Sequence, residues 1–199
     1  MAALTTLATL KAELGVTGSS QDTRLSALIN QVSDAIETFC DRKFQRRTVT
    51  ETVLRHRRTI YLSAWPVVSI ASITDSGVAW TADDYTLDAD EGIITRSLYG
   101  VGYGSPCGYD SFAALSIAYT GGYILPGAEG SNLPGDLERA CLDLASRYFH
   151  GGGRDPALRS ETVPGVIEQS WSAVDSIQTV GGLPLDVARS LSGYKRAIL

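Results

Sequence analysis

The chain has 199 residues, of which 44 % are apolar and 20 % charged, and its formal net charge is −5. This length and composition suit one domain, or one domain with an insertion, and the negative charge disfavours nucleic-acid binding over the whole surface. No apolar run approaches the roughly 18 residues of a membrane span, and the first residues lack the pattern of a signal peptide, so we expect no membrane partner. Cys40, Cys107 and Cys141 are an odd number and widely spaced, which disfavours a disulfide framework and a zinc site.

Two helices are predicted at the start of the chain. Residues 6–14 form a short helix, because Thr6 suits the N-cap position and Gly15 suits a left-handed C-cap. Residues 20–40 form the longest periodic segment, and Ser19 with Asp22 has the spacing of a capping box at its start. The second helix needs a partner for its apolar face, which consists of Leu25, Leu28, Ile29, Val32, Ile36, Phe39 and Cys40.

The pattern changes to that of β-strands after Phe44. Residues 45–58 are rich in Thr and Val and alternate between two faces, with Val49, Glu51 and Val53 on one of them. Further strands are predicted at 59–62, 67–74, 85–87, 92–95 and 114–123, and the turn sequence DADEG joins the third and fourth of these as a hairpin. Together they predict a small antiparallel β unit, inserted at about residues 44–120.

A third helix is predicted at 134–149, with Pro134 in its first turn and the glycines after His150 at its end. Its apolar stripe makes it the expected partner of the 20–40 helix and consists of Leu137, Cys141, Leu144, Ala145 and Tyr148. The predicted fold class is therefore α+β, with a small helical core of three main helices, an inserted antiparallel β unit and an extended C-terminal arm. We expect residues 1–153 to form a single domain and residues 154–199 to form the arm, with a short helix at about 184–191.

The arm has little regular pattern but is not uniformly polar. Its apolar residues are Val163, Val166, Ile167, Trp171, Val174 and Ile177. A compact monomer rarely carries so long a segment without regular structure, so we expect this arm to become ordered against another surface, such as a second copy of the chain. Trimming the chain after Gly153 is expected to leave a folded protein that no longer joins its assembly.

The sequence contains no recognisable catalytic or metal-binding motif. His56 and His150 have no ligand partners at metal-binding spacing, and the glycine-rich segment around Cys107 is not followed by a helix that could bind a phosphate. Cys40 and Cys141 lie on apolar stripes and are expected in the core. We therefore expect no enzyme and no cofactor; a small hydrolase that uses Cys107 or His56 stays an alternative without a positive motif behind it.

The strongest electrostatic feature is the stretch 42–58. It carries +6, which leaves −11 for the rest of the chain, because it has one acid, Glu51, and seven basic residues: Arg42, Lys43, Arg46, Arg47, Arg55, Arg57 and Arg58. Three interpretations stay open: a solvated strand whose charges prevent aggregation, contacts with another subunit, and contacts with nucleic acid.

Taken in order, these elements resemble the head–tail connector family of tailed bacteriophages, also called adaptor or head-completion proteins, which includes proteins of phage-derived gene-transfer agents. The resemblance covers about Leu4 to Phe149 and rests on LKAELGV, on DTRLSALINQVSDAIETFCDRKF and, most characteristically, on YTGGY and LPGDLERACLDLASRYF. The segment LPLDVARSLSGYKR also looks like the C-terminal motif of the family.

This resemblance implies a structural virion protein that forms a ring, expected to be a dodecamer, between the portal protein and the tail. It would extend the channel through which DNA passes without sequence-specific contact, dock a tail or stopper protein, and lie in the virion neck after assembly in the host bacterial cytoplasm. The alternative is a DNA-contacting accessory protein that uses the basic strand at 42–58. The candidate subunit or portal interface residues are Arg46, Arg47, Arg55, Arg57, Arg58, Trp171, Leu183, Leu185, Leu191, Tyr194, Lys195 and Arg196.

Overall fold

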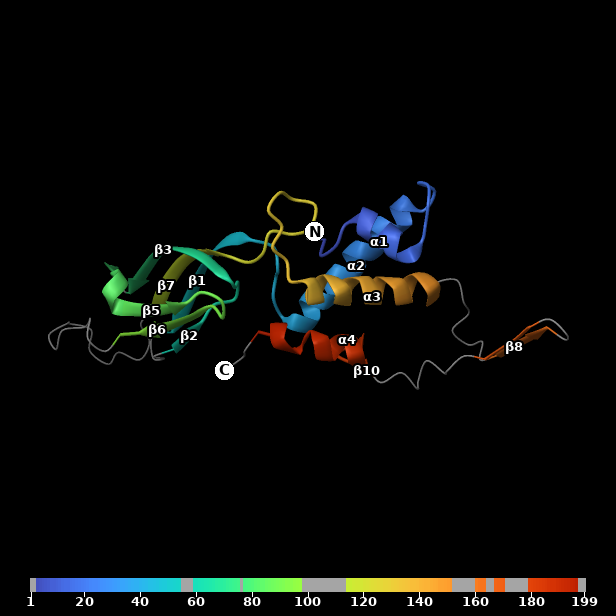
Figure 1. Cartoon of the computed structure of the whole chain (residues 1–199). Helices are drawn as coiled ribbons and strands as arrows, with labels where there is room; N and C mark the ends of the chain where they lie inside the picture. The colour runs from blue at the N-terminus through green and yellow to red at the C-terminus, as the bar shows by residue number, and fades with distance from the viewer. Residues whose placement is uncertain are drawn as a thin grey trace. The chain divides into compact units, whose positions relative to one another are not determined.

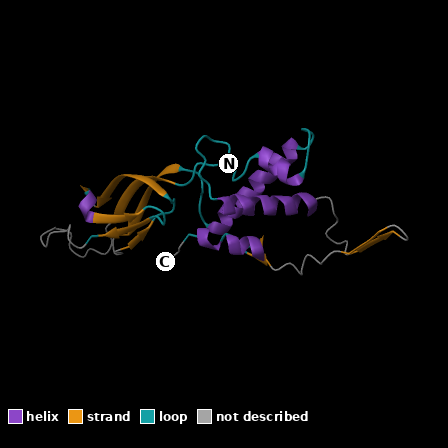
Figure 2. Ribbon diagram, viewed as in Figure 1, coloured by secondary structure: helices purple, strands orange, loops and turns teal. Residues whose placement is uncertain are grey.

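The computed structural model describes residues 3–54, 59–75, 77–97, 114–151, 160–163, 167–170 and 179–196 (Figure 1). The chain divides into two compact units: a helical unit of residues up to Asp41 together with Leu125–Lys195, and a β unit of Arg42–Ile124, to which Arg196 also belongs. Helices dominate the first unit and strands the second (Figure 2). The chain thus leaves the helical unit, builds the β unit and returns, and the predicted α+β class with its inserted β unit is confirmed.

Helix α1 (Leu7–Leu14) has the predicted caps. The Thr6 hydroxyl accepts the Thr9 N–H at 3.1 Å, and Gly15 adopts the left-handed conformation, with φ of 63°. The predicted capping box of helix α2 (Asp22–Cys40) is wrong, because its N-cap is Gln21 and no side chain caps it. The Asp22 carboxylate is instead bound by Lys11 from α1, with Nζ 2.6 Å from Oδ1, so a tertiary ion pair replaces the local cap.

Helix α3 (Gly135–Gly151) packs against α2, as predicted, and against α1. It extends through His150 and Gly151, two residues further than expected, because one glycine in a last turn costs a helix only about 1 kcal/mol. The shared core is mainly apolar, and the buried polar residues of the described helical unit are Thr5, Ser33 and Glu37. Ser33 accepts the Leu4 N–H at 3.1 Å and lies 3.9 Å from the Cys141 sulfur. The fully buried apolar side chains of the core include Leu10, Leu25, Val32, Ile36, Leu137 and Leu144.

The cysteines of this core are confirmed as packing residues. Cys40 and Cys141 are both fully buried and form no disulfide. Burial raises the pKa of the Cys141 thiol to about 12, against a smaller opposing effect of the Ser33 hydrogen bond. Such a thiol stays protonated at neutral pH and is not a nucleophile.

The C-terminal residues return to the helical unit. Strands β10 (Thr179–Val180) and β11 (Leu183–Pro184) pair antiparallel, and helix α4 (Leu185–Ser190) packs on α3, followed by the short 3-10 helix η3 (Ser192–Tyr194). Between α3 and β10, strands β8 (Ser160–Val163) and β9 (Ile167–Ser170) pair antiparallel as a hairpin. The part of the arm that the structure describes therefore has short elements only, and the predicted short helix is present.

The β unit consists of two antiparallel sheets. The first has the order β1-β7-β3-β4, and its strands are β1 (Arg47–Leu54), β7 (Ala114–Gly121), β3 (Val67–Asp75) and β4 (Val78–Ala79). The second has the order β2-β6-β5, with β2 (Thr59–Tyr61), β6 (Ile93–Arg96) and β5 (Tyr85–Asp88), the last preceded by the 3-10 helix η1 (Ala82–Asp84). The predicted hairpin at 85–95 is β5–β6.

Both sheets contribute to one apolar cluster, which contains Ile60 and Ile94 from one sheet and Ile73, Ile117 and Tyr119 from the other. The predicted alternation of β1 is also present: Val49, Glu51 and Val53 are partly buried, whereas the threonines between them are exposed. Among the described residues, no helix is long and apolar enough to cross a membrane.

We predict that Ile36→Asp unfolds the helical unit. Ile36 is fully buried between helices, and an unpaired carboxylate there costs several kcal/mol, on the order of the whole stability of a small domain. Circular dichroism during thermal unfolding measures the loss. The matched control is Ser26→Asp, at an exposed position of the same helix, which should unfold within a few degrees of the unmodified chain. Equal melting temperatures for both variants would contradict the predicted core.

Candidate assembly surfaces

The basic stretch does not form one continuous exposed patch. Arg42 is 4 % exposed, and its guanidinium stacks on the Trp65 ring, 3.4 Å from the centroid, close to the rings of Phe44 at 4.9 Å and Tyr123 at 6.0 Å. It also donates a hydrogen bond to the Trp65 carbonyl. Arg42 therefore serves the β unit as a packing residue, and its charge is not available to a partner.

The other basic residues of this stretch divide into two groups. Lys43 and Arg47 are exposed, and Arg46 is half-buried, with its Nε donating to the Gly122 carbonyl at 3.5 Å. The predicted interface residues Arg55, Arg57 and Arg58 lie outside the described residues, as do His56, Cys107 and Trp171. In the described part of the stretch, Lys43 and Arg47 are thus the basic side chains classed as exposed, fewer than the sequence suggested.

Glu51, the one acid of the stretch, is part of a hydrogen-bond network inside the β unit. Its carboxylate accepts hydrogen bonds from the Tyr119 hydroxyl and from the hydroxyl and N–H of Ser63, the latter at 3.1 Å. The Tyr119 oxygen in turn accepts the Ala64 N–H at 3.0 Å. Burial and the hydrogen bond to Glu51 raise the pKa of Tyr119 above its ordinary value of 10.0. The only sequence signal for this network is an acid on the inward face of a strand.

We predict that Tyr119→Phe lowers the free energy of unfolding by about 1–3 kcal/mol, because the Ala64 N–H and the Glu51 carboxylate each lose a hydrogen-bond partner inside the β unit. A Tyr whose pKa is raised by folding stabilises the fold below its unfolded pKa and loses that contribution as the pH rises through the folded value. Denaturant unfolding of the unmodified chain should therefore weaken above about pH 10, and the variant should lack that part of the loss. If the unfolding free energies of the unmodified chain and of Tyr119→Phe depend on pH in the same way, the proposed hydrogen-bond network is contradicted.

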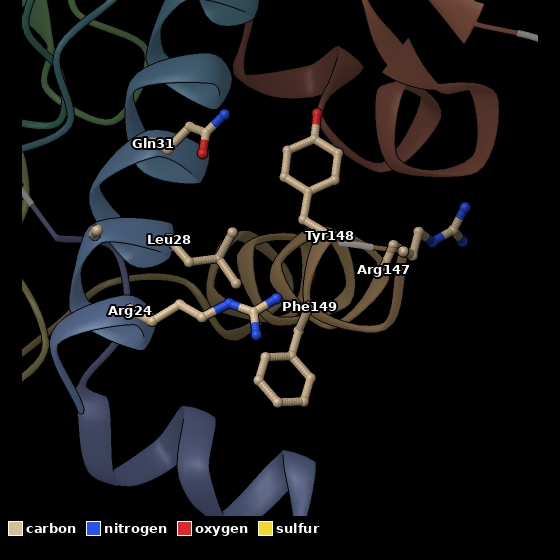
Figure 3. A pocket seen from close by; sticks show the side chains of 8 residues that line it. Arg24, Leu28, Gln31, Arg147, Tyr148 and Phe149 are labelled. Atoms are coloured by element: carbon tan, nitrogen blue, oxygen red, sulfur yellow. The ribbon is translucent and has the colours of Figure 1, made fainter. Parts of the chain in front are cut away.

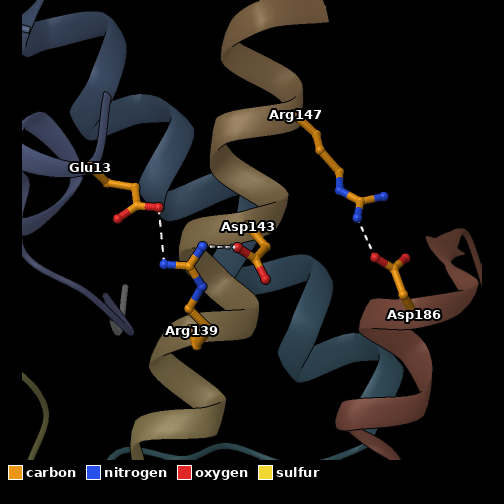
Figure 4. Close-up of polar contacts among 5 residues, drawn as sticks. All are labelled: Glu13, Arg139, Asp143, Arg147 and Asp186. Atoms are coloured by element: carbon orange, nitrogen blue, oxygen red, sulfur yellow. Dashed lines mark hydrogen bonds and ion pairs between the residues drawn. The ribbon is translucent and has the colours of Figure 1, made fainter. Parts of the chain in front are cut away.

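The C-terminal motif is tied to the helical unit by specific contacts. Arg147 of α3 pairs with Asp186 of α4 (Figure 4). The Tyr194 hydroxyl donates to Asp136 Oδ1 at 2.6 Å. The Lys195 ammonium lies 4.0 Å from the centroid of the Phe39 ring. At Asp186, burial is the largest single effect and raises the pKa of the carboxyl, but the hydrogen bonds from the Val187 N–H and Arg147, together with the charge of Arg147, outweigh it, so this pKa is lowered.

The predicted interface residues of the C-terminal motif fall into two groups, buried and at least partly exposed. Leu183 and Leu191 are buried within their own subunit, at 2 % and 0 % exposure, so they hold the motif in place and present no surface to a partner. Leu185 and Tyr194 are half-buried, and Lys195 and Arg196 are exposed. The surface that the motif offers is therefore polar and basic.

The structure changes the expectation for a chain trimmed after Gly153, because that trimming removes Leu183, Val187, Ala188 and Leu191, all buried. We predict a loss of more than about 3 kcal/mol in unfolding free energy, since burying each large apolar side chain contributes about 1.5–3 kcal/mol. Chemical denaturation measures it, with a chain ending at Arg196 as the control. Equal stability of the two truncated chains would show that the motif does not stabilise the helical unit.

Further ion pairs link α1 to α3. Arg139 of α3 binds Glu13 of α1 at 2.9 Å and Asp143 of its own helix at 2.7 Å (Figure 4). These groups are more than one-third exposed, and such surface pairs contribute little to stability. They are already partnered, so they are weak candidates for binding another molecule.

A groove of about 540 Å³ lies between α2 and α3. Its lining residues are Arg24, Ala27, Leu28 and Gln31 of α2 and Arg147, Tyr148, Phe149 and Gly151 of α3 (Figure 3). Tyr148, predicted on the apolar stripe of α3, is 38 % exposed, because α2 does not cover the last turns of that stripe. Sequence periodicity could not distinguish this uncovered end from the buried middle of the helix.

The described residues contain no group of three or more His, Cys, Asp or Glu side chains that could hold a metal ion. His150 is exposed and makes an edge contact with Phe149, at 5.4 Å between ring centroids. The described surface thus offers a groove and exposed basic residues for contact with another molecule.

Comparison with known proteins decides the family. The sequence matches the profile described as "HCP: Head completion protein" over residues 3–165. The chain belongs to the head completion protein family. This is a family of structural phage proteins, so the chain is a structural virion protein and not an enzyme, as the resemblance of the sequence implied.

Two solved structures have a similar fold. One chain is from the "Neck of empty GTA particle computed with C6 symmetry" and one from the "Virion of native gene transfer agent (GTA) particle". Each has 18 % sequence identity and a TM-score of 0.54, and the match covers 97 % of this chain and 90 % of the other. No protein of curated function matches the chain.

Proposed function

We propose that the chain forms a ring in the neck of a tailed-phage-type particle, between the portal protein and the tail. Its family membership over residues 3–165 carries this proposal. The likeness in fold to chains from gene transfer agent particles, one of them from a neck computed with C6 symmetry, supports a ring whose copy number is a multiple of six, and we propose twelve copies. In that ring the chain would extend the DNA channel and dock a tail or stopper protein.

A ring subunit needs two different surfaces, because each copy meets the next by a heterologous contact. The chain offers surfaces of different kinds: the groove between α2 and α3, the exposed end of the C-terminal motif at Lys195 and Arg196, and the basic residues of 42–58. We propose that residues 1–153 act as the connector domain and that 154–199 act as an arm that contacts a neighbour or the portal.

We assign the exposed basic residues of 42–58 to contacts with acidic surface on a neighbouring copy. Arg42 and Arg46 are engaged within the β unit, which leaves fewer free charges for DNA than the sequence suggested. The net charge of −5 also opposes tight binding along DNA, a property that suits a channel through which DNA slides. The engagement of Arg42 and Arg46 and the negative net charge also disfavour the alternative of a DNA-contacting accessory protein.

The function is tested with particles from cells that lack the protein. We expect DNA-filled heads without attached tails, and complementation with the unmodified chain should restore tailed, infectious or transducing particles. Tailed and fully active particles in the absence of the protein would overturn the proposal. The fraction of particles that carry a tail is counted in electron micrographs of negatively stained samples.

We predict that charge reversal at Arg55, Arg57 and Arg58 together reduces tailed particles at least tenfold, since each lost charge contact opposes ring closure. The matched control replaces the same three residues by Lys, which keeps the charge and should retain most assembly. Each variant is expressed in cells that lack the protein, and the tailed particles are counted. Normal assembly of the reversed variant would exclude this stretch from the contact, and equal failure of the Lys variant would point to shape instead of charge.

A further inference from the structure

The groove between α2 and α3 is an apolar surface that its own helical unit leaves partly open. Leu28, Tyr148 and Phe149 form its apolar floor, and the Tyr148 side chain is 38 % exposed. Figure 3 shows Leu28 and Arg24 extending from α2 toward α3, whose Tyr148 and Phe149 side chains point to opposite sides, while Arg147 points away from α2. A groove of about 540 Å³ has the size that accommodates a few side chains of a peptide.

The two arginines of the groove differ in their partners. Arg147 pairs with Asp186, whereas Arg24 has no carboxylate within ion-pair distance in the described parts of the chain. The Arg24 guanidinium lies 5.2 Å from the centroid of the Phe149 ring, a contact that keeps its charge at the edge of the apolar floor. The groove therefore favours an apolar segment that also carries acids.

The arm of this chain has that chemistry. Residues 160–178 contain three acids and no Lys, Arg or His, and the acids are Glu161, Glu168 and Asp175. The same residues include Val163, Val166, Ile167, Trp171, Val174 and Ile177. Moreover, the arm begins at the groove, since Gly151, which ends α3, is one of the lining residues.

We propose that the segment 160–178 of one copy binds in the groove between α2 and α3 of the next copy. Its apolar side chains pack on Leu28, Tyr148 and Phe149, and an acid pairs with Arg24. This inference rests on the proposed ring and adds to it the surface that receives the arm.

The arm is suited to such an exchange, because both of its ends are fixed to one subunit. Helix α3 ends at Gly151 before the arm, and after the arm come β10 and then α4, which is held by Leu191 and the Arg147–Asp186 pair. A segment attached at both ends and bound to a neighbour links adjacent copies around a closed ring. Each copy then gives one arm and receives one, which is the heterologous contact that a ring requires.

Disulfide cross-linking identifies the subunit that supplies the arm. The variant combines Ala27→Cys in the groove with Ser172→Cys next to Trp171, in a chain whose Cys107 is replaced by Ser; Cys40 and Cys141 are buried. Oxidised particles are analysed on a non-reducing gel. We expect a ladder of covalent multimers that disappears with reductant, and no ladder from either single variant.

Other results of this experiment overturn the proposal. A disulfide within one chain, without a ladder, would place the arm in the groove of its own subunit. If the particles contain a visible ring but no cross-link forms, the arm binds elsewhere, on the portal or the tail. If unmodified particles contain no ring of this protein, the proposed function fails, and the inference fails with it; the ring image thus distinguishes the two failures.

A charge exchange tests the chemistry of the contact. We expect Arg24→Glu to reduce assembled rings at least tenfold, and Glu161→Arg, Glu168→Arg or Asp175→Arg, added to it one at a time, to restore assembly in at least one combination. Thr23→Glu, exposed on the same helix but outside the groove, is the matched control and should assemble normally. Normal assembly of Arg24→Glu, or no rescue by any of the three changes, would overturn the pairing.

Discussion

The structure of this chain depends on the apolar contact between α2 and α3. The two helices are separated in sequence by the whole β unit, so burial of their apolar faces against each other requires a contact between distant parts of the chain. Val32, Ile36, Leu137, Cys141 and Leu144 are inaccessible to solvent in this contact. Because the hydrophobic stabilisation of a small unit comes mainly from such burial, the packing of α1 and α4 on α3 depends on it.

Two buried polar features give the β unit a specific internal structure. Arg42, the residue after the left-handed Asp41 that ends α2, is enclosed by three aromatic rings. Glu51 joins two strands and a loop through Tyr119 and Ser63. Buried polar groups are costly when unpaired, so both favour one arrangement of the strands around them. They also remove charge from the surface that the sequence alone presents as basic.

The sequence predicted those parts of the fold that depend on local pattern. The caps of α1, the apolar stripes of α2 and α3, the alternation of β1 and the β5–β6 hairpin all follow from residues close together in the chain. Contacts between distant residues were not predictable in this way: Lys11 binds Asp22, so the expected capping box is absent, and Arg42 lies among Phe44, Trp65 and Tyr123. The C-terminal motif was recognised, but periodicity could not show that Leu183 and Leu191 pack on their own subunit, nor that α2 leaves Tyr148 uncovered.

The central claim is that this member of the head completion protein family forms a ring between portal and tail. Electron cryo-microscopy of intact particles, reconstructed at the portal vertex without imposed symmetry, tests it most directly. We expect a ring whose subunits fit the helical unit and the β unit, with density from an arm in the groove next to Arg24. A portal joined to the tail by rings into which neither unit fits would contradict it.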